Sequence, residues 1–217
     1  SKLLISGLMD TIYNNIYFLI IGKYYSAVHL GQYTRAEQFN SIFSSNLTNV
    51  VQRVSYPVLC SIQDDDERLK FTYRRVIKAT MLVAFACMLG LAAIAKPLIL
   101  ITIGEKWLPA VPYLQIICFV GMLQPLHAIN LNMLMVKGRS DLFLRLEIIK
   151  KAIAVIPICI GVFYGIELML WGSVFISFVA FVLNSYYSAR LINYSTWAQI
   201  KDIFTSFLVS IIVAAAM

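Results

Sequence analysis

Long apolar runs separated by short charged clusters are the feature that most constrains this chain of 217 residues. The sequence is 60% hydrophobic and only 13% charged, whereas a soluble domain carries about 25% charged residues. A soluble core of this size cannot bury so many long apolar segments, and the alternation is typical of membrane-spanning helices. We therefore predict an all-α fold, a polytopic bundle of transmembrane helices.

The apolar runs predict six complete spans and a seventh that begins near Ile203 and is cut short by the end of the chain. Because the first residue is Ser1 and not Met, we expect a fragment of a longer membrane protein. The fifth run is shorter than the hydrocarbon core, so either Glu167 lies at a thinned interface or that helix continues to Trp171. The complete spans are expected at residues 3–22, 38–62, 79–95, 112–136, 152–166 and 168–187.

Most of the 18 Lys and Arg residues fall on one side of the predicted membrane, chiefly in the connections at residues 64–78 and 137–151. Because Lys and Arg are enriched in cytoplasmic loops, we expect this side to be cytoplasmic and the first span to run outward. Both connections are candidates for short amphipathic helices on that side.

The net charge of +7 does not indicate nucleic-acid binding, because the basic residues lie at the ends of apolar runs. The four cysteines fall in separate apolar runs and lack the spacing of a metal site or a disulfide framework. We therefore expect no metal and no cofactor, and we interpret the cysteines as small apolar side chains.

Polar side chains are concentrated in the first, second and fourth predicted spans. A carboxylate such as Asp10 inside an apolar helix is costly, so we expect it to face protein or water and to mark a pathway. Residues three or four positions apart share a helix face, and one polar stripe on each span predicts a shared water-filled cavity. The candidate cavity residues are Asp10, Asn14, Asn46, Asn49, Gln52, Arg53, Gln124, His127 and Asn130.

The residue types in this set point to a sugar with an anionic group. Arg53 suits the anion, because a guanidinium stays charged and binds phosphate through paired hydrogen bonds. The Asn and Gln amides suit sugar hydroxyls, since each amide both donates and accepts. Tyr13, Tyr17 and Tyr56 are available to stack on sugar rings.

Each polar group also has a purely structural interpretation. Amides and hydroxyls in a span often join neighbouring helices. Asp10 and Arg53 can form a structural ion pair, and His127 can bond a backbone carbonyl rather than respond to protons. Under this interpretation the polar groups hold the bundle together and bind no ligand.

Four segments follow one another along the chain: LGQYTRAEQF at residues 30–39, ERLKFTYRRVIK at 67–78, AKPLILITIGEKWLPAVPYLQI at 95–116 and KGRSDLFLR at 137–145. The third contains a Gly-x-x-Trp element at Gly104 and Trp107. In this order and spacing the segments resemble recurring elements of Wzx-type bacterial polysaccharide flippases. These transporters are members of the multidrug/oligosaccharidyl-lipid/polysaccharide (MOP) superfamily, and the resemblance covers most of the chain.

The resemblance implies that residues 1–217 are the C-terminal transmembrane lobe of a MOP/MATE-like transporter with two lobes. It implies a V-shaped cavity, alternating access and a place in the bacterial inner membrane. The implied protein is a flippase and not an enzyme, and it moves a lipid-linked (undecaprenyl-diphosphate) oligosaccharide for surface or exopolysaccharide synthesis. Its implied partners are that oligosaccharide, membrane lipids, a polysaccharide polymerase and glycosyltransferases. No residue role is carried over, because the family has no single site motif.

Coupling and two other functions stay open. A proton or cation gradient is a candidate driving force for the flippase, with Asp10 or His127 as candidate couplers. A multidrug exporter of the same superfamily, coupled to Na⁺ or H⁺, would share the fold. A membrane-embedded transferase would need an acid/base pair or metal-binding carboxylates at a membrane face, and the acidic cluster of this chain is Asp64, Asp65 and Asp66.

Overall fold

The computed structural model describes residues 15–216, so the candidates Asp10 and Asn14 lie outside the described residues. In this part the chain is all-α, as predicted, with one 3₁₀ helix, η1 (Glu105–Ala110). Residues 15–24 form a helix. The α-helices that follow are α2 (Ala27–Ser61), α3 (Asp66–Ala93), α4 (Ala95–Thr102), α5 (Val111–Gly121), α6 (Gln124–Val136), α7 (Ser140–Tyr164), α8 (Ile166–Ile192) and α9 (Thr196–Ala215).

Among the described residues, four segments are long and apolar enough to cross a membrane: α3, the stretch from η1 to α6, α8 and α9. They confirm the prediction of a multi-pass membrane protein. α2 and α7, with 35 and 25 residues, are also long enough. Amides and hydroxyls make α2 polar, and Glu147, Lys150 and Lys151 lie in the middle of α7. The total of six complete spans therefore stays a prediction.

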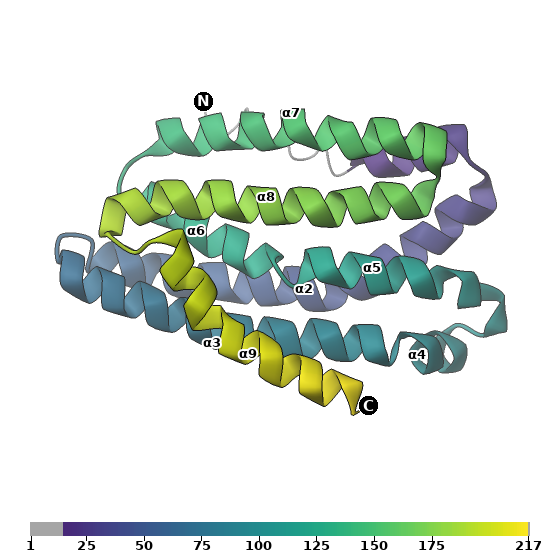
Figure 1. Cartoon of the computed structure of the whole chain (residues 1–217), viewed down its shortest axis with the longest axis horizontal. Coiled ribbons are helices and arrows are strands. Elements are labelled where there is room, and N and C mark those ends of the chain that lie inside the picture. The colour runs from purple at the N-terminus through teal and green to yellow at the C-terminus, as the bar shows by residue number, and fades with distance from the viewer. Residues whose placement is uncertain (1–14, 217) are drawn as a thin grey trace.

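The long helices run roughly along the long axis of the molecule, and α9 crosses α3 at an angle (Figure 1). α7 packs against α8, α3 against α9, and α2 against α5 and α6. α5 and α6 also contact α8, and their buried side chains include Leu114, Ile117, Leu126, Ile129 and Met133. This central stretch therefore joins the α7–α8 pair to α2 and α3.

The connections alternate between the two ends of the bundle, and the turns α2–α3, α6–α7 and α8–α9 gather at one end (Figure 1). Lys137 Nζ lies 2.7 Å from the Gln63 carbonyl oxygen and 2.7 Å from Asp66 Oδ1, which ties two of these turns together. This end carries the basic connections, so we assign it to the cytoplasmic side of the membrane.

Several helices are longer than the predicted spans. α2, α3 and α7 each begin about three helical turns before residues 38, 79 and 152, where spans were expected. The prediction of separate amphipathic helices in the basic connections is therefore wrong. Residues 66–78 and 140–151 contain no Gly or Pro that would stop a helix. The Asp65 carboxylate also caps α3, because it accepts the Arg68 backbone N–H at 3.0 Å.

The fourth predicted span is two helices, because α5 ends at Gly121 and α6 begins at Gln124. Pro125 has no N–H to continue a helical ladder, and it lies in the first turn of α6, where no N–H is needed. The fifth predicted span ends at Tyr164, and Gly165 follows with a φ of 113° that favours glycine. That helix does not continue to Trp171, and Glu167 lies exposed in the first turn of α8.

Asn130, a candidate cavity residue, lies in a buried polar cluster between α3, α6 and α8. Its Oδ1 accepts the hydroxyls of Tyr73 at 2.6 Å and Ser188 at 2.7 Å, and its Nδ2 donates to the Leu126 carbonyl at 3.0 Å. Steps of three residues rotate by about 60° around a helix, so Asn130 points about 120° away from Gln124. Asn130 therefore joins α6 to α3 and α8. This is the structural interpretation that the sequence left open for the amide side chains.

Replacing Asn130 with alanine should lower the free energy of unfolding by about 1–2 kcal/mol, because buried hydroxyls lose their acceptor. Chemical unfolding of the purified full-length protein in detergent measures this change. Asn49→Ala is the matched control, because Asn49 is exposed on α2 and should leave stability unchanged. Equal stability of both variants would contradict the role of the cluster.

Candidate functional site

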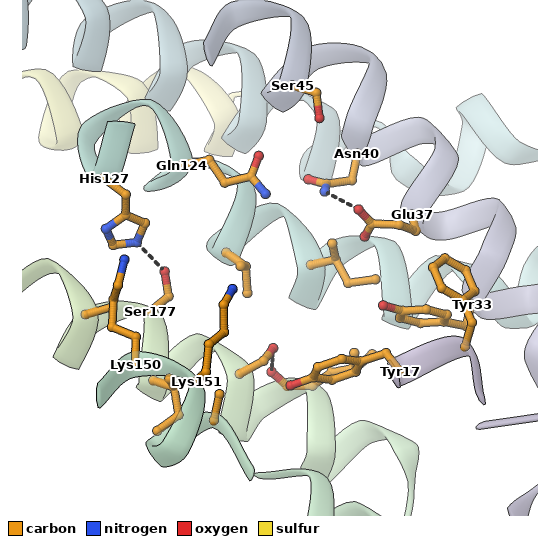
Figure 2. Close-up of a pocket in the computed structure, with 18 of the residues that line it drawn as sticks. Tyr17, Tyr33, Glu37, Asn40, Ser45, Gln124, His127, Lys150, Lys151 and Ser177 are labelled. Carbon is orange, nitrogen blue, oxygen red and sulfur yellow. Dashed lines mark hydrogen bonds between the residues drawn. The ribbon is translucent and has the colours of Figure 1, made fainter. Parts of the chain in front are cut away.

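A polar cavity of about 470 Å³ lies between the helix at residues 15–24 and helices α2, α5, α6, α7 and α8 (Figure 2). Its volume is within the range of small-molecule sites, about 300–1,000 Å³. Its polar and aromatic lining residues are Tyr17, Phe18, Tyr33, Glu37, Asn40, Ser45, Gln124, His127, Glu147, Lys150, Lys151, Ser173 and Ser177. Two lysines in a membrane bundle make the cavity the leading candidate for a functional site.

The wall formed by α7 carries two cations and one carboxylate. Glu147, Lys150 and Lys151 follow at i, i+3 and i+4, so they share one face of the helix. Lys150 forms an ion pair with Glu147, and Lys151 Nζ lies 3.9 Å from Glu147 Oε2. The side chains of Lys150 and Lys151 are only 15% and 19% exposed. Because two mostly buried ammonium groups share one carboxylate, this wall favours an anionic ligand.

The wall formed by α2 carries an aromatic ring, a carboxylate and one amide group. Tyr33, Glu37 and Asn40 follow at i, i+4 and i+7 and face the cavity (Figure 2). Asn40 Nδ2 donates to Glu37 Oε1 at 3.4 Å. The rings of Tyr17 and Tyr33 are stacked, with centroids 6.5 Å apart and planes 17° from parallel. Such rings offer flat faces for the apolar side of a sugar, and the amide offers a donor and an acceptor for its hydroxyls.

The wall formed by α6 and α8 fixes the orientation of His127. His127 Nε2 lies 3.1 Å from Ser177 Oγ, and Nδ1 lies 3.4 Å from Asn184 Nδ2. The Asn184 amide nitrogen can only donate, so Nδ1 accepts, and in this tautomer the Nε2–H donates to Ser177. The partners of His127 are thus side chains on α8 and not the backbone carbonyl considered from the sequence.

The structure brings together some of the predicted candidates and separates others. Gln124 and His127 line the cavity. Asn46, Asn49 and Arg53 are exposed on α2, and Gln52 is half-buried outside the lining. Positions nine residues apart on a helix lie about 180° apart, so Asn49 is on the opposite face of α2 from Asn40. The polar stripe predicted on α2 therefore points away from this cavity.

Sequence reasoning missed the charged residues that do line the cavity. In the sequence, Lys150 and Lys151 look like topology signals at the end of the basic connection at residues 137–151, and Glu37 stands only within the LGQYTRAEQF segment. The signal that identifies the α7 residues is the i, i+3, i+4 spacing of Glu147, Lys150 and Lys151 directly before a long apolar run.

An all-α bundle with several membrane-crossing helices around a polar cavity defines a multi-pass membrane protein. Residues 1–112, just over half of the chain, match the family model described as "Polysaccharide biosynthesis protein". The chain belongs to this polysaccharide biosynthesis family, and the predicted relation to Wzx-type proteins is confirmed by its relatives.

Three curated bacterial relatives show the extent of the similarity. The teichuronic acid biosynthesis protein TuaB of Bacillus subtilis (strain 168) is 28% identical over 206 residues, 94% of this chain and 43% of TuaB. The lipopolysaccharide biosynthesis protein WzxC of Escherichia coli (strain K12) is 26% identical over 155 residues, 71% of this chain and 32% of WzxC. The succinoglycan biosynthesis transport protein ExoT of Rhizobium meliloti (strain 1021) is 28% identical over 108 residues, 49% of this chain and 22% of ExoT.

The chain spans less than half of the length of these relatives. No solved structure matches it significantly.

Proposed function

We propose that the full-length protein moves a lipid-linked oligosaccharide, carried on undecaprenyl diphosphate, across the bacterial inner membrane by alternating access. The observation that carries this proposal is the cavity, in which Lys150 and Lys151 lie opposite the Tyr17–Tyr33 pair and the α2 amide. The lysines suit the diphosphate, and the aromatic and amide groups suit the sugar. The proposal concerns the whole transporter. The match with this chain covers 43% of the length of TuaB.

The physical need for such a cavity follows from the bilayer. A sugar headgroup that crosses about 30 Å of hydrocarbon without help loses hydrogen bonds to water, each at a cost of several kcal/mol. A polar cavity with hydroxyls, amides and cations replaces those bonds while the polyprenyl tail stays in lipid. Glycosyltransferases would supply this substrate on the cytoplasmic side, and a polymerase would use it on the other side.

The description of ExoT as a transport protein supports a carrier rather than a transferase. The acidic cluster considered for a transferase also has structural roles. Asp65 caps α3, and Asp66 forms an ion pair with Lys137. A catalytic role for this cluster therefore has no support in its contacts.

One observation favours the multidrug exporter as a second candidate. Glu37 is a carboxylate on the cavity wall opposite the lysines, beside the Tyr17–Tyr33 pair. A cationic, aromatic drug would suit this side of the cavity.

A transport assay with two substrates separates the two functions. The full-length protein is reconstituted in proteoliposomes and given either a fluorescent undecaprenyl-diphosphate oligosaccharide or a cationic dye. We expect transfer of the oligosaccharide between leaflets above the rate in protein-free liposomes, and no transport of the dye. Transport of the dye without transfer of the oligosaccharide would overturn the proposal in favour of the exporter.

A further inference from the structure

A second hollow, of about 760 Å³, lies at the cytoplasmic end of the bundle, where α8 turns into α9 beside α3. Figure 1 shows this turn next to α3. The hollow shares no lining residue with the polar cavity. Its charged and aromatic lining residues are Lys70, Arg74, Tyr186, Arg190, Tyr194 and Trp197. We call it the basic groove.

The basic groove carries an excess of positive charge. Lys70 and Arg74 lie one turn apart on α3, and Arg190 lies in the last turn of α8. Asp202 of α9 forms ion pairs with Arg74 and with Lys78, whose Nζ lies 3.0 Å from Asp202 Oδ1. These pairs fix Arg74 in place while half of its side chain, 52%, stays exposed. The groove is therefore lined by three basic side chains, those of Lys70, Arg74 and Arg190, and by no acidic one among the described residues, so it attracts an anion.

An exposed apolar stripe leads along α8 to the basic groove. Phe175, Phe178, Val182 and Tyr186 follow at intervals of three or four residues, and Arg190 comes one turn later. Phe175 is 68% exposed, and the other three are about half exposed. Arg190 holds its guanidinium 4.4 Å from the centre of the Tyr186 ring. One helix face therefore offers apolar contacts, then an interfacial aromatic ring, then a cation.

We propose that the basic groove binds the phosphate of an anionic phospholipid in the cytoplasmic leaflet, with an acyl chain along the apolar stripe of α8. Basic pockets between helices at the cytoplasmic surface are suited to anionic headgroups, and Trp and Tyr are suited to the headgroup depth. Trp197, 74% exposed, marks this depth on α9.

The apolar stripe argues for a phospholipid over a soluble phosphate, which would contact only the cations. The separate position of the groove argues for a resident lipid over the transported lipid-linked sugar, because groove and cavity have no lining residue in common. The proposal does not depend on which substrate the cavity carries.

Binding of fluorescent phosphatidylglycerol to the full-length protein in phosphatidylcholine nanodiscs tests the site. The variant is Lys70→Gln/Arg190→Gln, which leaves the Asp202 ion pairs intact. We expect roughly thirtyfold weaker binding of phosphatidylglycerol than in the wild type, because two cations near the surface are lost. Phe178→Ser/Val182→Ser, on the apolar stripe, should also weaken binding.

The matched control is Lys96→Gln/Lys106→Gln, which removes two basic residues at the opposite end of the bundle and should leave binding unchanged. Glycerol phosphate and a short-chain polyprenyl-diphosphate sugar are the competitors. Equal binding by wild type and Lys70→Gln/Arg190→Gln would overturn the proposal. Displacement by glycerol phosphate at equal concentration would overturn the role of the stripe. Stronger displacement by the polyprenyl-diphosphate sugar would overturn the assignment to a phospholipid.

Discussion

Replacing both Lys150 and Lys151 with glutamine should lower the transfer of lipid-linked oligosaccharide by the full-length protein at least about tenfold. A hydrogen bond from a charged group contributes about 1.5–3 kcal/mol, and about 1.4 kcal/mol corresponds to a factor of ten. Both lysines line the cavity and are mostly buried, so water does not replace them as donors to the diphosphate. Initial rates in proteoliposomes measure the effect.

The double variant leaves Glu147 buried without its cations, so a loss of folding must be separated from a loss of binding. The variant Glu147→Gln/Lys150→Gln/Lys151→Gln removes all three charges and keeps the side-chain volumes. We expect it to fold and still to transport at least about tenfold more slowly. Arg145→Gln, on the exposed face of α7, is the control that should keep the wild-type rate.

Arg53→Gln tests whether the anion binds at Arg53, as the sequence predicts, or at Lys150 and Lys151, as the structure indicates. We expect little change, because Arg53 lies outside the cavity lining. A folded triple variant with the wild-type rate, together with a strong loss in Arg53→Gln, would show that the diphosphate binds at α2 and not at α7.

Replacing Gly121 with valine should lower the free energy of unfolding by about 3 kcal/mol, because it overpacks a tight contact. A Cβ at position 121 would lie 2.2 Å from Asn40 Oδ1 and 2.6 Å from Met88 Cε. Both neighbours are 1% exposed, so valine would force Met88 to shift within the core and would push Asn40 away from its hydrogen bond with Glu37. Gly121 is therefore the point at which α5 approaches α2 and α3 closely. Denaturant titration of the full-length protein in detergent measures the loss.

Gly90→Ala is the matched control for this variant. Gly90 lies inside α3, and a Cβ there would meet no atom within 4 Å. Alanine forms helices better than glycine by about 1 kcal/mol, so this variant should be as stable as the wild type or more stable. Similar stability of Gly121→Val and the wild type would show that α2 and α5 do not pack as described.

The residue pattern predicted the fold class better than the ends of the helices. Apolar runs identified the spans at α3 and α8, because a bilayer requires long apolar segments. The seventh span, expected from Ile203 and incomplete, is α9, which begins at Thr196 and is long and apolar enough to cross a membrane. The starts of α3 and α7 were missed, because charged turns outside the hydrocarbon continue the same helix without an apolar signal. The division of the fourth predicted span into two helices, with Pro125 in the first turn of the second, was visible only in the structure.

The candidate site shows the same limit at the level of single residues. Gln124 and His127 line the cavity, whereas Asn130 from the same span joins α3 to α8. The three residues look equivalent in the sequence. Their spacing tells how they are arranged around their own helix, but not which neighbouring helices each of them contacts. Lys150 and Lys151 look like a topology signal in the sequence, because their spacing does not tell which neighbouring helices their face of α7 meets.

The sequence by itself determined that this is a helical membrane protein, it predicted that the basic side is cytoplasmic, and its ordered segments pointed to the polysaccharide biosynthesis family. Hydropathy and charge suffice for this, since they act between each segment and the bilayer. Only the tertiary structure decided which polar groups meet. The rotation of each helix about its axis depends on packing against its neighbours, and that rotation turned Lys150, Lys151 and Glu37 toward one cavity and Asn49 and Arg53 away from it.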